Sequence, residues 1–271
     1  MPNLSVILRN IEGEDINRVI KSVRDSSIND KDIEIIVVSY SKSFSDYFQD
    51  GVHFLLCDAK RLEAKLLGIR AAKSEKILFL DSDQTVSIDL IPKVISFEHK
   101  VGIIPERSSN VHFMARLMDA KRKGTEKLML KHPRPELPVL PRLFCKGVIE
   151  SALTALGDDV IKNATWPEDS LIYYETTKVT KDIGWVNSYI FNLDPNLKNF
   201  VQKSFYYGLK NEQNIIRNSM PEEYKTLIRK IQFETFLNNR SLNLGMMLCN
   251  IIRGVPFLLG SLRSKFGRSL E

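Results

Sequence analysis

The chain has 271 residues, of which 43% are hydrophobic and 27% are charged, and its formal net charge is +6. This is an ordinary globular composition, and the length allows one large α/β domain or two small ones. The three cysteines, Cys57, Cys145 and Cys249, are scattered and form no C-x-x-C pair. The sequence therefore predicts neither a zinc site nor a disulfide framework, and it fits a reducing, cytosolic compartment.

The basic balance favours anionic partners such as nucleic acid, anionic lipid or a phosphorylated substrate. No signature of an RNA-recognition motif, a helix-turn-helix or a zinc finger occurs, so nucleic acid is not expected as a partner. The first fifteen residues reach acidic side chains within a few positions and contain no apolar core of a secretory signal, so export is not expected.

Strand and helix patterns alternate over the first hundred residues. Short apolar runs predict strands, and apolar residues at spacings of three and four predict the helices between them. Such alternation is typical of βαβ units with a mostly parallel sheet and right-handed crossovers. The expected strands are 4–8, 33–38, 53–56, 77–80 and 101–104, and the expected helices are 16–23, 62–73 and 88–97.

The sequence KILFLDSDQ, residues 76–84, is the most informative stretch. Its apolar run suits a strand covered on both faces, and Asp81 and Asp83 follow where the strand should end. Ligands of open α/β sheets bind outside the carboxyl ends of the strands. Two carboxylates there suit a hard divalent cation that can hold phosphates, although acids in this position are also common turn residues. No glycine-rich dinucleotide or P-loop motif is present.

The middle of the chain is less regular. Residues 131–142 carry four prolines and are expected to form an extended loop. Residues 166–170, WPEDS, have a proline and two acids typical of a helix start. The other expected elements are helices at 114–123, 197–205 and 224–231 and a strand at 183–186.

Residues 242–260 are mostly apolar and are followed by Arg263, Lys265 and Arg268. The segment is about long enough to span a bilayer, but Arg253 near its centre argues against a simple span. An apolar segment flanked by basic residues fits a helix that lies in the membrane interface. A core helix or a dimer contact remains the alternative.

Several of these features together resemble the family-2 glycosyltransferases. Residues 64–69, AKLLGI, resemble the family's A-R-N-x-G-I segment, and ILFLDSD resembles its strand ending in D-x-D. Residues 141–144, PRLF, resemble its acceptor-side R-x-F segment, and Glu168-Asp169 resembles its E-D motif. The resemblance covers about residues 4–210. It implies a GT-A fold: a Rossmann-like, mostly parallel sheet flanked by helices, here with a helical C-terminal extension.

The resemblance also implies roles for individual residues. It implies an inverting transferase of the hexosyltransferase type, in which Asp81 and Asp83 hold Mg²⁺ or Mn²⁺ at the donor diphosphate. Asp169 would be the general base that deprotonates the acceptor hydroxyl. The remaining candidates divide into a donor side, Ser39 and Lys65, and an acceptor side, Arg142, Glu168 and Trp166.

The implied organisation is a glycosyltransferase domain at 1–210, with a nucleotide-sugar half at 1–110 and an acceptor half at 111–210, followed by a membrane-associating tail at 211–271. We expect a nucleotide-sugar donor, a lipid-linked or glycan acceptor, and contact with the membrane surface through residues 242–268. The expected location is cytoplasmic, peripheral at the inner face of the cell membrane.

Three departures from the family pattern keep alternatives open. Leu66 replaces the family's asparagine, the second strand ends in Ser39-Tyr40-Ser41 where acids are usual, and Asp194 stands where many relatives have a metal-binding histidine. The Q-x-x-R-W motif of processive synthases is missing, so a single sugar is expected per encounter. The alternatives are a non-catalytic GT-A-fold protein that binds a glycan or a partner, and a nucleotidyltransferase.

Overall fold

The computed structural model describes residues 2–10, 15–27, 29–39, 51–57, 60–131, 141–163, 168–209 and 240–267. Contacts within the chain group these residues into two compact units. The first comprises residues 1–105 and 139–191, and the second comprises residues 106–138 and 192–271. The division at 110 and 210 expected from the sequence stays a prediction. The predicted helix at 224–231 lies outside the described residues.

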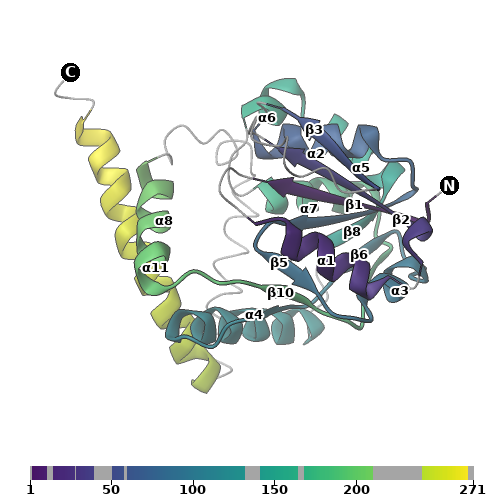
Figure 1. Ribbon diagram of the computed structural model, residues 1–271. Coiled ribbons are helices and arrows are strands. Elements are labelled where there is room, and N and C mark those ends of the chain that lie inside the picture. The colour runs from purple at the N-terminus through teal and green to yellow at the C-terminus, as the bar shows by residue number, and fades with distance from the viewer. Residues whose placement is uncertain are drawn as a thin grey trace. The chain divides into compact units, whose positions relative to one another are not determined.

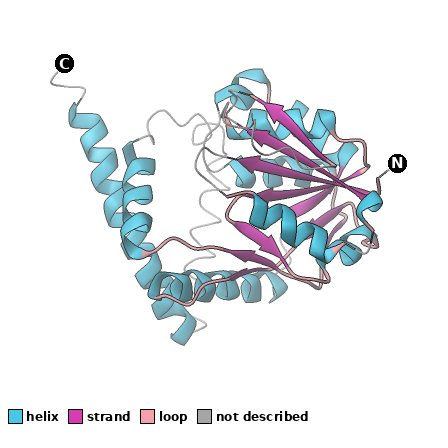
Figure 2. Ribbon diagram, in the orientation of Figure 1, coloured by secondary structure: helices cyan, strands magenta, loops and turns pink. Residues whose placement is uncertain are grey.

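The first unit is built on a seven-stranded sheet in the order β3-β2-β1-β4-β8-β6-β9 (Figures 1 and 2). Six strands run parallel to one another, and β8 runs against its neighbours β4 and β6. This confirms the predicted α/β class with a mostly parallel sheet. The strands are β1 (Leu4–Asn10), β2 (Ile33–Ser39), β3 (Val52–Leu56), β4 (Lys76–Asp81), β6 (Val101–Ile103), β8 (Pro141–Cys145) and β9 (Ile183–Trp185).

Helices cover both faces of this sheet. Side chains alternate between the faces along each strand, so Leu4, Val6 and Leu8 point one way and Ile7 points the other. The first face packs against α1 and α3, whose buried residues join the same apolar cluster. The helices are α1 (Asn17–Ser26), α2 (Arg61–Ala71), α3 (Leu90–Ile95), α5 (Lys146–Thr154), α6 (Asp158–Asn163) and α7 (Glu168–Val179), and the short elements η1 (Asp30–Asp32), β5 (Gln84–Val86) and β10 (Ile190–Asn192) complete this part of the chain.

Helix α2 packs closely on the opposite face because Gly68 has no side chain. A Cβ atom at Gly68 would lie 2.6 Å from a methyl carbon of Ile7 and 3.3 Å from one of Val38. The glycine therefore sets how near α2 can approach β1 and β2. This spacing matters for function, since α2 carries two of the charged residues described below.

The second unit is largely helical and contains α4 (Phe113–Lys131), α8 (Leu197–Leu209), α11 (Arg240–Gly267) and the short strand β7 (Glu106–Ser108). Helices α8 and α11 lie side by side (Figure 1). Their backbones touch through two glycines: a Cβ at Gly208 would lie 2.0 Å from the carbonyl oxygen of Phe257, and one at Gly260 would lie 2.2 Å from that of Phe205. None of the described helices is both long enough and apolar enough to cross a membrane.

The close contact at Gly68 yields a stability prediction. We expect Gly68→Ala to lower the free energy of unfolding by about 1–3 kcal/mol, because the new methyl overlaps the branched, poorly adjustable side chain of Ile7. Urea denaturation followed by circular dichroism measures the change. Gly147→Ala in α5 is the matched control, because a Cβ there meets nothing within 4 Å. Equal stability of the two variants would contradict the packing argument.

Candidate active site

The candidate site begins at the carboxyl ends of three neighbouring parallel strands. In the sheet, Arg9 of β1 lies in register with Val38 of β2 on one side and Asp81 of β4 on the other. Ser39, the last residue of β2, is in register with Asn10 and is buried. Parallel pairing therefore brings Arg9, Ser39 and Asp81 to one edge of the sheet. Proteins of the α/β class bind their ligands at this edge.

The two acids of the D-x-D sequence lie at the turn between β4 and β5. Asp81 is the last residue of β4, and its backbone N–H donates a hydrogen bond of 2.9 Å to the side-chain oxygen of Gln84. Gln84 is buried, so this hydrogen bond holds the turn against the protein interior. Asp81 and Asp83 are both half-buried, which leaves part of each side chain accessible to a ligand.

Arg142 reaches this edge because β8 is antiparallel to β4. Pairing of Lys76 with Cys145 and of Leu78 with Leu143 places the beginning of β8 beside the end of β4. The Arg142 side chain is only 7% exposed, and its Nη1 atom lies 3.2 Å from Asp81 and 3.7 Å from Asp169. One guanidinium group thus bridges the predicted metal-binding acid and the predicted base.

The start of α7 supplies Glu168 and Asp169, as the helix-start signal predicts. The ammonium group of Lys65, on α2, donates a hydrogen bond to Asp169 and lies 4.0 Å from Glu168. The Lys65 side chain is 5% exposed, and its Nζ atom is 5.5 Å from the centre of the Phe79 ring. A buried lysine is stable only with such partners, so Lys65 and the two acids fix one another's positions.

Arg61 is a site residue that sequence reasoning missed. Its Nη1 atom lies 3.2 Å from Glu168, and its position four residues before Lys65 puts both cations on one face of α2. The four-residue spacing of Arg61 and Lys65 at the start of the predicted helix already indicates that both side chains lie on the same face. Arg61 was missed because only the segment from Ala64 onward resembles a family motif.

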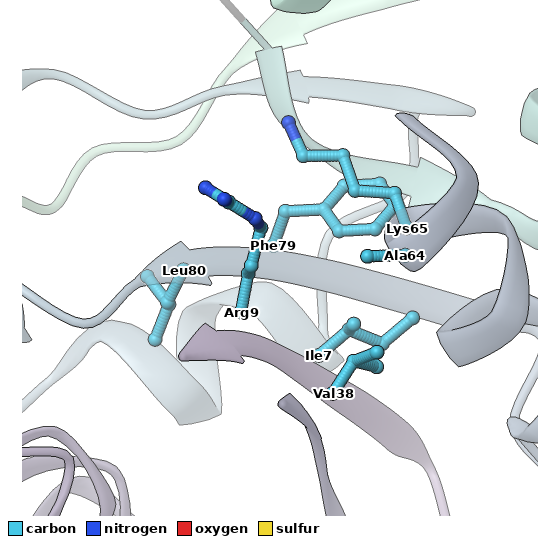
Figure 3. A pocket seen from close by; sticks show the side chains of 7 residues that line it. All are labelled: Ile7, Arg9, Val38, Ala64, Lys65, Phe79 and Leu80. Atoms are coloured by element: carbon cyan, nitrogen blue, oxygen red, sulfur yellow. The ribbon is translucent and has the colours of Figure 1, made fainter. Parts of the chain in front are cut away.

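A hollow in the first unit lies next to these charges (Figure 3). Lys65 and Arg9 both border it, and the ring of Phe79 forms part of its wall. The space between these side chains is too small to hold a water molecule, so Lys65 and Arg9 border a closely packed region and not an open cavity. Its lining consists of Ile7, Arg9, Val38, Ala64, Lys65, Phe79 and Leu80.

The electrostatics divide the three acids into two kinds. Burial alone would raise the pKa of Asp81, but Arg142 and then Lys65 outweigh it, so the pKa lies below its usual value. Burial also opposes ionisation of Asp169, yet Lys65 and Arg142 lower its pKa to about 2. Glu168 is the opposite case: burial and the neighbouring Asp169 charge raise its pKa, and Arg61 and Lys65 offset only part of that. Asp81 and Asp169 are therefore ionised at neutral pH.

The carboxylates Asp81 and Asp83 are the donors available to a divalent metal ion. Among the described residues, no group of three or more His, Cys, Asp or Glu side chains is arranged to hold an ion. Mg²⁺ in nucleotide sites commonly uses one or two carboxylates and takes its remaining ligands from substrate phosphates and water. The two acids fit a site of that kind, which the substrate would complete.

The structure thus brings Lys65, Asp81, Arg142, Glu168 and Asp169 into one connected cluster. Ser39 lies at the same sheet edge, and Asp83 lies two residues beyond Asp81. The predicted site residue Trp166 lies outside the described residues, as does Tyr40, which follows Ser39 in the chain.

Asp194, considered above as a substitute for a histidine ligand, belongs to the second unit. It accepts two hydrogen bonds from the guanidinium of Arg122, of 2.7 and 2.8 Å, and a third from the hydroxyl of Ser108. Its carboxylate is therefore committed to a buried ion pair inside that unit.

Part of the chain matches a known protein family. Residues 6–131 match the family model described as glycosyl transferase family 2. The matched segment begins within β1, contains α2 and the Asp81-Ser82-Asp83 turn, and ends before β8 and α7. Among curated proteins, none matches the chain.

Solved structures of TarS from S. aureus share the fold. TarS 1–349 in complex with UDP superposes with a TM-score of 0.53 at 12% identity, covering 98% of this chain and 92% of that one. The complex of TarS 1–349 with UDP-GlcNAc gives a TM-score of 0.51 at 10% identity, with the same coverage. The longer TarS chain gives 0.51 at 14% identity over 78% of this chain, which spans 39% of the TarS chain. The fold is therefore that of the GT-A glycosyltransferases.

The contact between Lys65 and Asp169 gives a titration prediction. We expect Lys65→Met to raise the pKa of Asp169 from about 2 towards the ordinary aspartate value near 3.9, because the adjacent positive charge is lost. Carbon-13 NMR of the labelled carboxylates measures this. A lowered folded-state pKa stabilises the fold above about pH 4, and this contribution is lost as pH falls through about 2. The stability gap between wild type and variant should therefore close over that window.

Lys60→Met is the matched control, because Lys60 precedes the same helix but is exposed. It should leave the pKa of Asp169 in place. An unchanged pKa in Lys65→Met would show that Lys65 is not the principal counterion of Asp169.

Proposed function

We propose that the chain is an inverting glycosyltransferase that moves one sugar from a nucleoside-diphosphate sugar to an acceptor hydroxyl or phosphate. The observation that carries the proposal is the bridge made by Arg142 between Asp81 and Asp169. A transferase of this type must hold the leaving diphosphate beside the base that activates the acceptor. Two carboxylates on opposite sides of one guanidinium meet that requirement.

On the donor side, the proposal assigns the diphosphate to the edge formed by β2, β1 and β4. Lys65 and Arg142 supply positive charge, and Ser39 lies where the nucleoside enters. Asp81 and Asp83 would hold Mg²⁺ or Mn²⁺, which would offset charge on the leaving diphosphate. The TarS complexes with UDP and UDP-GlcNAc make uridine nucleotides and a hexosamine donor the first candidates to test.

On the acceptor side, Asp169 is proposed as the general base, with Glu168 positioning the acceptor. With Lys65 and Arg142 as partners, Asp169 has a pKa of about 2 and is a weak base. A diphosphate that engages these two cations would draw positive charge from Asp169, and the pKa of its carboxylate would rise. Donor binding would thereby prepare the base before the acceptor oxygen attacks the anomeric carbon.

The proposed acceptor is lipid-linked, and the proposed location is the cytoplasmic surface of the cell membrane. Residues 242–268 would provide the membrane contact, because they combine apolar side chains with basic ones and contain no acid. An acceptor at the membrane surface would then reach a transferase bound to that same surface.

The proposal predicts the outcome of a turnover assay. With UDP-sugars, Mn²⁺ and a polyprenyl-phosphate acceptor, we expect Asp169→Asn to reduce UDP release by about 100- to 10,000-fold, the range for loss of a general base. Asp83→Ala should instead weaken the dependence of turnover on metal concentration. Asp25→Asn, which changes an exposed carboxylate in α1, should retain full turnover.

Calorimetry with UDP, GDP and Mn²⁺, together with a pyrophosphate assay, distinguishes a glycosyltransferase from the two alternatives. Absence of binding of any nucleotide to the wild-type protein would favour a non-catalytic GT-A-fold protein that binds a glycan or a partner. Release of pyrophosphate, measured with a sugar phosphate and a nucleoside triphosphate, would favour a nucleotidyltransferase. Full turnover in both Asp83→Ala and Asp169→Asn would show that the site assignment is wrong.

A further inference from the structure

Helix α11 carries a continuous apolar stripe on its exposed side. Eight aliphatic side chains contribute to it, with exposed fractions between 39% and 70%. At 3.6 residues per turn they all fall within a sector of about 120°, and at 1.5 Å per residue the stripe is about 27 Å long. Its members are Leu244, Met247, Leu248, Ile251, Val255, Leu258, Leu259 and Leu262.

The opposite side of α11 is packed inside the second unit. Cys249 is fully buried in a cluster with Met114 and Phe200, and Gly260 lies against the backbone of α8. Asn250 accepts a hydrogen bond of 3.0 Å from Lys121 on α4. One face of the helix therefore anchors it, which leaves the apolar stripe as a separate surface.

Arg253 lies on the packed side and not in the stripe. It is nine residues from both Leu244 and Leu262, which places it half a turn away from them around the helix axis. It is half-buried, close to Cys249 and to Tyr207 of α8. In the sequence alone, Arg253 argues against a membrane span. In the structure, its charge does not interrupt the apolar stripe.

The charged side chains of α8 and α11 are of one sign. Neither α8 nor α11 contains an aspartate or a glutamate, whereas Lys198 and Lys203 are exposed on α8 and Arg263 is exposed near the end of α11. The sequence adds Arg240 and Lys265 within the bounds of α11 and Arg268 after them in the chain. An aliphatic stripe flanked by basic residues is complementary to a bilayer with anionic headgroups. Protein interfaces, in contrast, are enriched in aromatic residues, and this stripe has none.

We propose that the stripe from Leu244 to Leu262 is a docking surface for an anionic membrane, with α11 lying in the plane of the interface. The eight aliphatic side chains enter the boundary between headgroups and acyl chains, and the basic residues contact the lipid headgroups. This inference refines the proposed membrane contact from a segment to one face of one helix. It does not depend on sugar transfer, since the surface lies wholly on α11.

Sedimentation with sucrose-loaded vesicles of phosphatidylcholine, with and without 30% phosphatidylglycerol, tests the proposal on the full chain. We expect wild-type protein to bind the anionic vesicles and to bind the neutral ones more weakly, with the difference decreasing at high salt. Val255→Gln combined with Leu258→Gln should weaken binding to the anionic vesicles at least about ten-fold, because two inserted side chains become polar.

The matched control is Ile88→Gln combined with Val111→Gln. These two apolar side chains are 71% and 76% exposed but lie outside α11, so the control should bind vesicles like the wild type. Thermal unfolding of both double variants would verify that they fold.

Three results would overturn the proposal. The first is no binding of wild-type protein to either vesicle, and the second is equal binding of the stripe variant and the wild type. The third is a wild-type dimer in light scattering that the stripe variant converts to a monomer, without vesicle binding by either, which would assign the stripe to a second copy of the chain. The assay needs no nucleotide sugar, so its failure is distinguishable from failure of the proposed activity.

Discussion

The candidate site depends on the mutual neutralisation of buried charges. Lys65 and Arg142 are almost completely enclosed, and neither would be stable there without carboxylates in direct contact. The carboxylates come from β4 and α7, and the cations come from α2 and β8. Four elements are thus joined by ion pairs at the edge of the sheet. An anionic ligand at this edge would compete with Asp81 and Asp169 for the same two cations.

The second unit uses the same principle for a structural purpose. Arg122 makes a paired hydrogen bond with the buried Asp194, and Arg107 lies 2.7 Å from Glu126. These pairs join β7, α4 and the segment that leads into α8. Helices α4 and α8 both pack against α11.

Much of the first unit was predictable from the sequence, because its signals are local. The run at 77–80 is apolar at every position and the run at 33–38 is apolar except at Glu34, as suits strands covered on both faces, and the structure has strands at β2 and β4. The helix-start signal at residues 166–170 also predicts α7, which begins at Glu168. The sequence does not predict β8, whose first two residues fall in the expected proline-rich loop, because a five-residue strand beginning with proline has no periodic signal. The helices α5 and α6 are short and were also missed.

By itself, the sequence determined the chemical identity of the site residues and the strands and helices that carry most of them. Only the tertiary structure decided which of them meet. The antiparallel direction of β8 brings Arg142 to Asp81, although 61 residues separate them, and the packing of α2 brings Lys65 to Asp169 across 104 residues. It also decided that Arg253 faces the interior of the second unit while the aliphatic residues of α11 face outward. The physical reason is that hydrophobic periodicity specifies each element locally, whereas strand direction and helix packing depend on contacts distant in the sequence.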